Sequence, residues 1–121
     1  MTEELLEGEL VFSGRLLEVH RDRVRLPDGS EGVREYIRHP GAVAIVALFA
    51  DGRVLLERQF RYPLRRVFVE IPAGKLEPDE KPEACAIRET EEETGFRPSG
   101  LEPLGWIWTT PGFCDEKIWL F

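Results

Sequence analysis

The amino-acid sequence predicts an α+β fold, in which β-strands from several parts of the chain accompany one central helix. Three patterns indicate this class: residues 9–37 alternate between apolar and charged side chains, residues 42–50 (AVAIVALFA) are continuously apolar, and a helical pattern is found at 82–94. Alternation is typical of a strand with one buried face, and a short apolar run is typical of a strand buried on both faces. Several strands accompanied by one central helix are typical of an α+β domain.

Residues 9–37 predict an antiparallel hairpin or a small meander. Two alternating segments, 9–26 and 33–37, flank Pro27-Asp28-Gly29, and an Asp-Gly pair between such segments favours a tight turn. We therefore predict an N-terminal β-meander at residues 1–40 and a second region at residues 41–121.

The second region is predicted to begin with a central strand at 42–50, which the Asp51-Gly52 turn ends. Further strands are predicted at 53–60, at 67–71, at 104–109 and from residue 117 onward. The last five residues, KIWLF, belong to an apolar strand, and Trp119 and Phe121 would lack cover if the domain ended there. We therefore expect the domain to be C-terminally incomplete.

The helix is predicted to run from Pro82 to about Thr94. Proline is favoured at the first helical position, and Gly95 is a typical C-terminal stop. At 100° per residue, a buried stripe of about 100° is predicted on one side of the helix. The residues on this stripe are Ala86, Ile87, Thr90 and Thr94.

Four acids crowd the end of this helix: Glu89, Glu91, Glu92 and Glu93. Each like-charged pair spaced i,i+4 costs about 0.2–0.5 kcal/mol. The usual explanation of such a run is a solvated charged face. The alternative is a bound cation, and oxygen ligands suit Mg²⁺ or Mn²⁺ better than zinc. Helical phase places Glu89 and Glu93 together beside the buried stripe and Glu92 on the next strip, whereas Arg88 and Glu91 face away.

Composition excludes several classes of protein. The net charge of −7 argues against a nucleic-acid partner. No apolar run approaches the roughly 20 residues needed to cross a bilayer, so no membrane association is expected. Cys85 and Cys114 are interpreted as reduced thiols of a cytoplasmic protein rather than as a disulfide or metal pair. His20 and His39 have no ligand-like spacing.

The helix and its flanks resemble the Nudix box, GX5EX7REUXEEXGU, in which U is bulky and aliphatic. Gly74, Glu80 and the segment RETEEETGF at 88–96 match every fixed Gly, Glu and Arg position. Thr90 departs from the pattern, because it occupies a U position. Since Thr90 lies on the predicted buried stripe, this departure concerns packing. The resemblance implies a Nudix-type mixed β-sheet with the box helix packed on it.

The resemblance also implies a divalent-metal site. It assigns metal contact to Glu89 and Glu93, with Glu92 close by and the main-chain carbonyl of Ala73 as a further ligand. Arg88 is expected to orient the helix by pairing with Glu80 or a neighbouring glutamate. The implied catalytic residues are Arg88, Glu89, Glu92 and Glu93, and the implied cofactor is Mg²⁺, with Mn²⁺ as an alternative.

Residues outside the box resemble the ADP-ribose pyrophosphatase branch of the family. Pro111 stands 15 residues after Phe96, in TTPGFCDE, and the segment ERQFRYPLRRVFVEIPAGKLE is similar to the same branch. The resemblance implies hydrolysis of ADP-ribose to AMP and ribose 5-phosphate, by a homodimer built through the N-terminal meander. The alternatives are a hydrolase of another nucleoside diphosphate sugar and a non-catalytic nucleotide-binding module. A loop glutamate often serves as general base in this branch, and no candidate for it is identified here.

Substrate-binding residues are predicted ahead of the box and after it. Arg58 and Arg61 belong to a basic segment in an otherwise acidic chain, and guanidinium groups suit two-pronged contacts with phosphate. Arg65 and Arg66 are interpreted as ordinary surface charge. Glu70 interrupts an apolar strand, where an unpaired carboxylate would be costly, so it is expected beside an arginine or the metal site. The predicted substrate-binding residues are Arg58, Arg61, Glu70 and Pro111.

Overall fold

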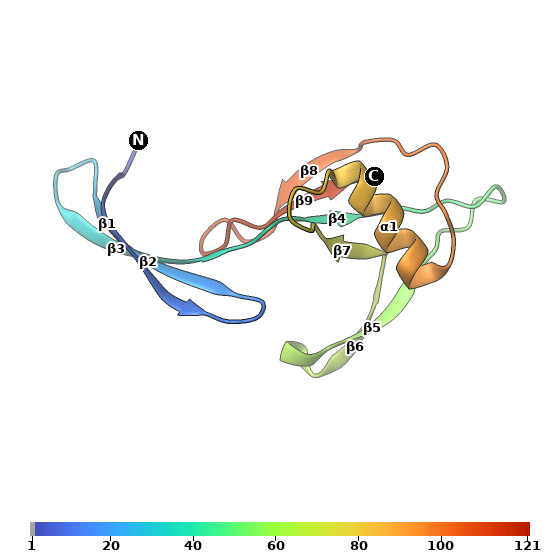
Figure 1. Ribbon diagram of the computed structural model, residues 1–121, viewed down its shortest axis with the longest axis horizontal. Helices are drawn as coiled ribbons and strands as arrows, with labels where there is room; N and C mark the ends of the chain where they lie inside the picture. The colour runs from blue at the N-terminus through green and yellow to red at the C-terminus, as the bar shows by residue number, and fades with distance from the viewer. Residues whose placement is uncertain (1) are drawn as a thin grey trace. The chain divides into compact units, whose positions relative to one another are not determined.

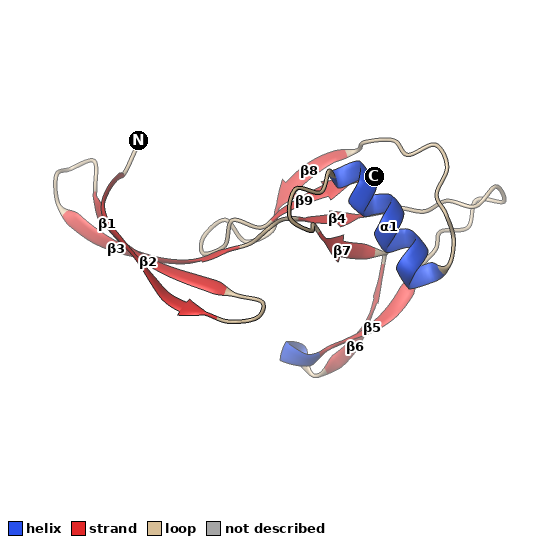
Figure 2. Ribbon diagram, in the orientation of Figure 1, coloured by secondary structure: helices blue, strands red, loops and turns tan. Residues whose placement is uncertain are grey.

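The computed structural model describes residues 2–121 and divides into two compact units (Figure 1). The first unit extends to His39 and includes Trp108–Glu116, and the second comprises Pro40–Ile107 and Lys117–Phe121. Strands predominate in both units of the described chain, and the α-helix α1 (Pro82–Thr94) lies in the second unit (Figure 2). The α+β class predicted from the sequence is confirmed.

The first unit is an antiparallel meander in the order β1-β2-β3, with β1 at Glu4–Ser13, β2 at Glu18–Arg25 and β3 at Glu31–Arg38. The turn between β2 and β3 closes where Gly29 adopts a φ of +87°, a conformation that favours glycine. The N-terminal meander is therefore confirmed, and its alternating segment 9–26 contains parts of two strands.

The loop that follows strand β8 (Gly105–Trp108) also belongs to the first unit. The Ile37 amide donates to the Phe113 carbonyl at 2.8 Å, and the Asp115 amide donates to the Ile37 carbonyl at 3.2 Å. These contacts group Trp108–Glu116 with the residues up to His39. This grouping depends on contacts between residues far apart in sequence.

The second unit contains a mixed sheet in the order β7-β4-β9-β8. Strand β4 (Ala42–Ala44) pairs antiparallel with β7 (Ala73–Lys75) and parallel with β9 (Lys117–Leu120). The two edge strands are β7 and β8 (Gly105–Trp108). A hairpin of β5 (Glu57–Arg61) and β6 (Arg66–Glu70), joined by the 3₁₀ turn η1 (Tyr62–Leu64), forms a separate two-stranded sheet.

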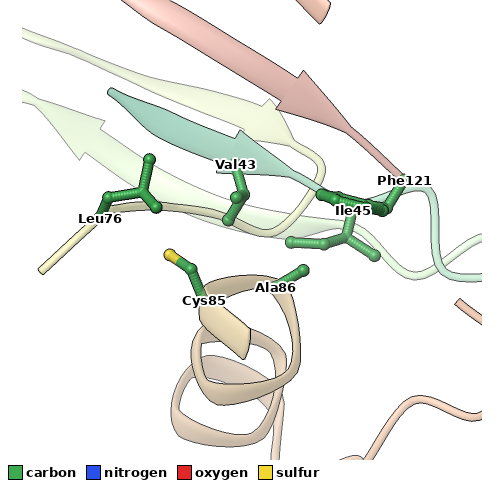
Figure 3. Close-up of a cluster of buried hydrophobic side chains, with 6 residues drawn as sticks. All are labelled: Val43, Ile45, Leu76, Cys85, Ala86 and Phe121. Carbon is green, nitrogen blue, oxygen red and sulfur yellow. The ribbon is translucent and has the colours of Figure 1, made fainter. Parts of the chain in front are cut away.

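Helix α1 runs from Pro82 to Thr94 and contacts β7 and β4. Gly95 follows in the left-handed conformation and donates to the Glu91 carbonyl, so both predicted ends are confirmed. Figure 3 shows the core between helix α1 and the sheet, which consists of Val43, Ile45, Leu76, Cys85, Ala86 and Phe121.

The predicted buried stripe of α1 is correct only in part. Ala86 and Thr90 are buried, whereas Ile87 and Thr94 are half-buried, and the fully buried Cys85 was not predicted. The Thr90 hydroxyl donates to the Ala86 carbonyl at 2.7 Å, which satisfies this hydroxyl inside the core.

The prediction of one long buried strand at 42–50 is wrong. Only residues 41–45 are continuously buried, and exposure then alternates, with Leu48 69% exposed. The chain leaves the sheet and turns back through hydrogen bonds between Phe49 and Arg53 and an isolated bridge between Leu48 and Val54. Consequently β5 starts at Glu57 rather than at residue 53. Among residues 2–121, no helix is long and apolar enough to cross a membrane.

Candidate functional site

Two carboxylates of α1 lie against strand β7 at Ala73 and Gly74. A Cβ atom on Gly74 would lie 1.9 Å from Glu89 Cδ and 2.3 Å from Glu89 Cγ, so a residue with a side chain could not sit here without displacing Glu89. One helical turn further on, Glu93 Oε2 accepts a hydrogen bond from the Ala73 amide at 3.3 Å. The helix and the strand therefore bring together the two acids that helical spacing had paired.

Arg88 ties this acidic face to the segment before the helix. Its Nε and Nη2 each donate to one oxygen of Glu80 at 2.8 Å, which is a two-pronged ion pair. Nη1 donates to Glu89 at 2.7 Å and to Glu92 at 3.1 Å, and Nη2 also donates to the Lys75 carbonyl at 3.2 Å. Arg88 thus turns toward β7 instead of facing solvent, and its side chain is 24% exposed.

The same arginine controls the ionisation of its partner. Its hydrogen bonds hold the pKa of Glu80 at about 2, far below the usual range of a glutamate. The pKa of Arg88 is correspondingly raised, first by its hydrogen bond with Glu80. The pair therefore stays charged under all ordinary conditions, and it fixes the side chain that contacts Glu89.

A fifth glutamate, Glu57 on β5, approaches the acids of α1. The pKa of Glu93 is raised, first by partial burial and then by the negative charge of Glu57, with a smaller effect from Glu89. The hydrogen bond from the Ala73 amide acts in the opposite direction. Sequence reasoning missed Glu57. The sequence pattern that could have identified Glu57 is its spacing: Glu57, Gln59 and Arg61 alternate along β5, and residues two apart in a strand lie on the same face.

Arg61 and Glu70 face each other across the β5–β6 hairpin. Arg61 Nε lies 2.9 Å and 3.1 Å from the two Glu70 oxygens, and Nη2 contacts the same carboxylate. This hydrogen bonding lowers the pKa of Glu70 and raises that of Arg61. The negative charges of Glu57 and Glu93 also contribute to the raised pKa of Arg61, so the ion pair lies on the side of the hairpin that faces the acids.

The structure does not bring Arg58 together with Arg61. Arg58 is opposite Val69 in the ladder, whereas Arg61 is opposite Arg66. Because residues three apart in a strand project to opposite faces, Arg58 shares its face with exposed Phe60 and Val69.

The other residues considered from the sequence lie elsewhere. Pro111 is exposed in the loop of the first unit. Glu91 is paired with Arg97 at 3.0 Å on the surface, away from the other acids. Both cysteines, Cys85 and Cys114, are free, and burial raises the pKa of the Cys85 thiol to about 12.

The donor chemistry at Ala73–Gly74 fits a hard divalent cation. Within residues 2–121 no three acidic, histidine or cysteine side chains already converge into a ready-made metal cage. Mg²⁺ needs no such cage, because it commonly binds one or two carboxylates and completes its shell with water and substrate phosphate. Glu89 and Glu93 supply two carboxylates, and the close packing of Glu89 on Gly74 leaves the strand backbone next to them.

Two family descriptions match the chain: the NUDIX domain over residues 38–121, and the nucleoside diphosphate sugar hydrolase N-terminal domain over residues 3–37. An ADP-ribose pyrophosphatase of Bacillus subtilis is 44% identical over 121 residues, which are 100% of this chain and 65% of that protein. A methanol dehydrogenase activator of Bacillus methanolicus is 45% identical over 119 residues, 98% of this chain and 64% of that protein.

A solved structure, the crystal structure of an ADP compounds hydrolase, matches with a TM-score of 0.89 at 25% identity, and the match covers 99% of this chain and 65% of that one. The chain thus spans slightly less than two thirds of the length of these relatives.

Family membership supports a divalent-metal requirement. The NUDIX match covers more than half of the chain and contains the helix, Gly74 and the paired carboxylates, which confirms the resemblance seen in the sequence. The chain therefore belongs to the Nudix hydrolase family.

Proposed function

We propose that this chain hydrolyses the diphosphate bond of ADP-ribose, with AMP and ribose 5-phosphate as products, and uses Mg²⁺ or Mn²⁺ to do so. The observation that carries the proposal is the convergence of Glu89 and Glu93 on the backbone of Ala73–Gly74. The name of the Bacillus subtilis relative supports ADP-ribose as substrate, at 44% identity.

In this proposal Glu89, Glu93 and the Ala73 carbonyl hold the cation. When bound there, the cation would supply positive charge that neutralises the diphosphate and would lower the pKa of a coordinated water molecule. Arg88 holds Glu89 in place through its bond at 2.7 Å, while Glu80 fixes the other side of the guanidinium. Glu92 is assigned to ordering water or a second ion, and its side chain is 60% exposed.

Arg61, Glu70 and Pro111 are assigned to substrate binding. The ion pair with Glu70 holds the Arg61 guanidinium in one orientation. The N–H groups that remain available would therefore favour one orientation of a bound phosphate or ribose. We also propose that Arg58 contacts the substrate, although it lies on the other face of the hairpin from Arg61. If so, Arg58→Gln should raise KM for ADP-ribose. An unchanged KM would show that Arg58 is a surface residue without contact to the substrate.

We further propose a homodimer formed through residues 1–40, with the catalytic region at residues 41–121, in the cytoplasm. The support for the dimer is the number of large apolar side chains that the meander leaves open in a single chain, among them Leu5, Leu10 and Phe12, which are 61%, 50% and 56% exposed. The two free cysteines support a reducing compartment. Sedimentation of a monomer at micromolar protein would contradict the dimer.

The substrate assignment is tested with a panel of ADP-ribose, GDP-mannose and UDP-glucose, with Mg²⁺ and product analysis. The expected result is that ADP-ribose has the highest kcat/KM. The runner-up is a hydrolase of another nucleoside diphosphate sugar, which the match at residues 3–37 supports. Equal or better turnover of GDP-mannose or UDP-glucose would replace the first proposal by this one.

A non-catalytic nucleotide-binding module is the remaining alternative. Glu93→Gln separates it from an enzyme, because removal of a metal-holding carboxylate should abolish Mg²⁺-dependent turnover. Glu91→Gln is the matched control, since Glu91 lies on the same helix but is paired with Arg97 on the surface. Wild-type protein that binds ADP-ribose without turnover in any divalent ion would establish the binding module.

A further inference from the structure

Hydrogen bonds fasten the loop between β8 and β9 to the end of β3. The Ile37 amide donates to Phe113, and the Asp115 amide donates to Ile37. In addition, the His39 amide donates to Asp115 Oδ1 at 2.7 Å, a bond between residues 76 positions apart. The loop that carries Pro111 is therefore held by Ile37 at the end of β3 and by His39 just after it, within the first unit.

The side chain of Glu116 bridges the two ends of this loop. Glu116 Oε2 accepts a hydrogen bond from the Thr109 hydroxyl at 2.7 Å, and Glu116 Oε1 lies 3.6 Å from His39 Nε2. The Thr109 amide also donates to the Glu116 carbonyl at 3.3 Å. The side chains of His39 and Glu116 are only 12% and 27% exposed, so the carboxylate has exchanged much of its water for these partners. Glu116 thus connects both ends of the loop to the residue after β3.

The loop forms one wall of a pocket of about 430 Å³ in the first unit. The other wall belongs to β2 and β3 and includes Tyr36, whose hydroxyl donates to Asp22 at 2.9 Å and whose ring stacks on His20. Because this second wall is fixed by its own contacts, the position of the loop decides the width of the pocket.

We propose that Glu116, held between His39 and Thr109, is a positioning residue that keeps the Pro111 loop in its substrate-binding position. The inference rests on the proposed function, because that function assigns Pro111 to the substrate. Glu116 acts through the loop, so its loss should weaken substrate binding and leave the rate of bond cleavage nearly unchanged.

The first test is Glu116→Ala, measured by amide hydrogen exchange and by steady-state kinetics. Exchange at the Ile37 and Asp115 amides should accelerate by about tenfold or more, as expected for loss of hydrogen bonds to a charged group. KM for ADP-ribose should rise by a similar factor, while kcat stays within about threefold. Glu31→Gln is the matched control, since Glu31 is an exposed carboxylate of β3 that is paired on the surface with Arg23.

Two further variants test whether His39 and Thr109 hold the loop through Glu116. His39→Ala combined with Glu116→Ala should be no worse than either single change, because both remove the same link. Thr109→Val removes only the hydroxyl and should show the same pattern at smaller magnitude, which keeps the test available if Glu116→Ala does not fold.

Three results would overturn the inference: a loss of kcat with unchanged exchange, additive effects of the His39 and Glu116 changes, or wild-type exchange and KM in both single variants. If the wild-type protein does not hydrolyse ADP-ribose, the proposed function fails. The exchange measurement then still decides whether Glu116 holds the loop.

Discussion

Gly74→Ala tests how the site is built, because the structure predicts the size of its effect. The added Cβ would lie 1.9 Å from Glu89 Cδ, whereas ordinary contacts begin at 3.4 Å, so the carboxylate must move by 1.5 Å. The φ of Gly74 is not positive, so backbone strain is not a factor. A displacement of this size also breaks the 2.7 Å bond between Arg88 and Glu89.

A misplacement of about 1 Å at a reacting centre costs on the order of 10²-fold in rate, which is about 2.7 kcal/mol of transition-state stabilisation. The cost to folding should be smaller, about 1–3 kcal/mol for an overpacked site, because a flexible side chain can move aside. We therefore expect Gly74→Ala to remain folded, to bind Mn²⁺ more weakly and to lose about two orders of magnitude in kcat/KM.

The assays are Mn²⁺ binding by electron paramagnetic resonance, Mg²⁺-dependent hydrolysis of ADP-ribose, and thermal unfolding. Gly32→Ala is the control, since a Cβ there meets nothing closer than 3.4 Å. A folded Gly74→Ala protein with wild-type Mn²⁺ affinity and turnover would refute the claim that the close approach of Glu89 to β7 creates the site.

The other predictions concern stability and reactivity. The carboxylate of Glu80, whose pKa is about 2 in the folded protein, stabilises the fold at pH values above its unfolded pKa, and this contribution is lost as the pH falls toward 2. Acid unfolding of Glu80→Gln should accordingly lack part of the pH dependence of the wild type, and identical profiles would show that the Arg88 pair is not coupled to folding. Iodoacetamide at pH 8 should label Cys114 in the folded protein and Cys85 only after unfolding, because Cys85 is fully buried and its pKa is about 12. Mass spectrometry that finds Cys85 modified in the native state would contradict this burial. Thr90→Val should be neutral or stabilising by up to about 1 kcal/mol in chemical denaturation, because the hydroxyl only adds a second bond to a helical carbonyl. A larger loss of stability would show that the hydroxyl is required in the core.

Part of the site could be predicted from sequence because it depends on local geometry. The 3.6-residue period places Glu89 and Glu93 one turn apart, and Pro82 and Gly95 mark the ends of the helix. The same local reasoning failed for residues 42–50. An apolar run indicates burial, but it does not show where the strand ends, and in this chain β4 ends at Ala44.

Glu57 and Glu93 are 36 positions apart in the sequence, one on a strand and the other on the helix. Because periodicity describes only neighbouring residues, no sequence period predicts that these two side chains approach each other. Similarly, Arg58 and Arg61 form one basic segment in the sequence, yet strand geometry directs them to opposite faces and gives only Arg61 a carboxylate partner.

By itself, the sequence determined the class of fold, the limits of the helix, and the family to which the chain belongs. Only the tertiary structure decided that Gly74 is needed for the approach of Glu89, that Arg88 turns toward the backbone of β7, and that the Pro111 loop joins the meander through His39 and Glu116. The physical reason is that helical phase and turn chemistry act over a few residues, whereas these contacts depend on where separate segments meet in the folded chain.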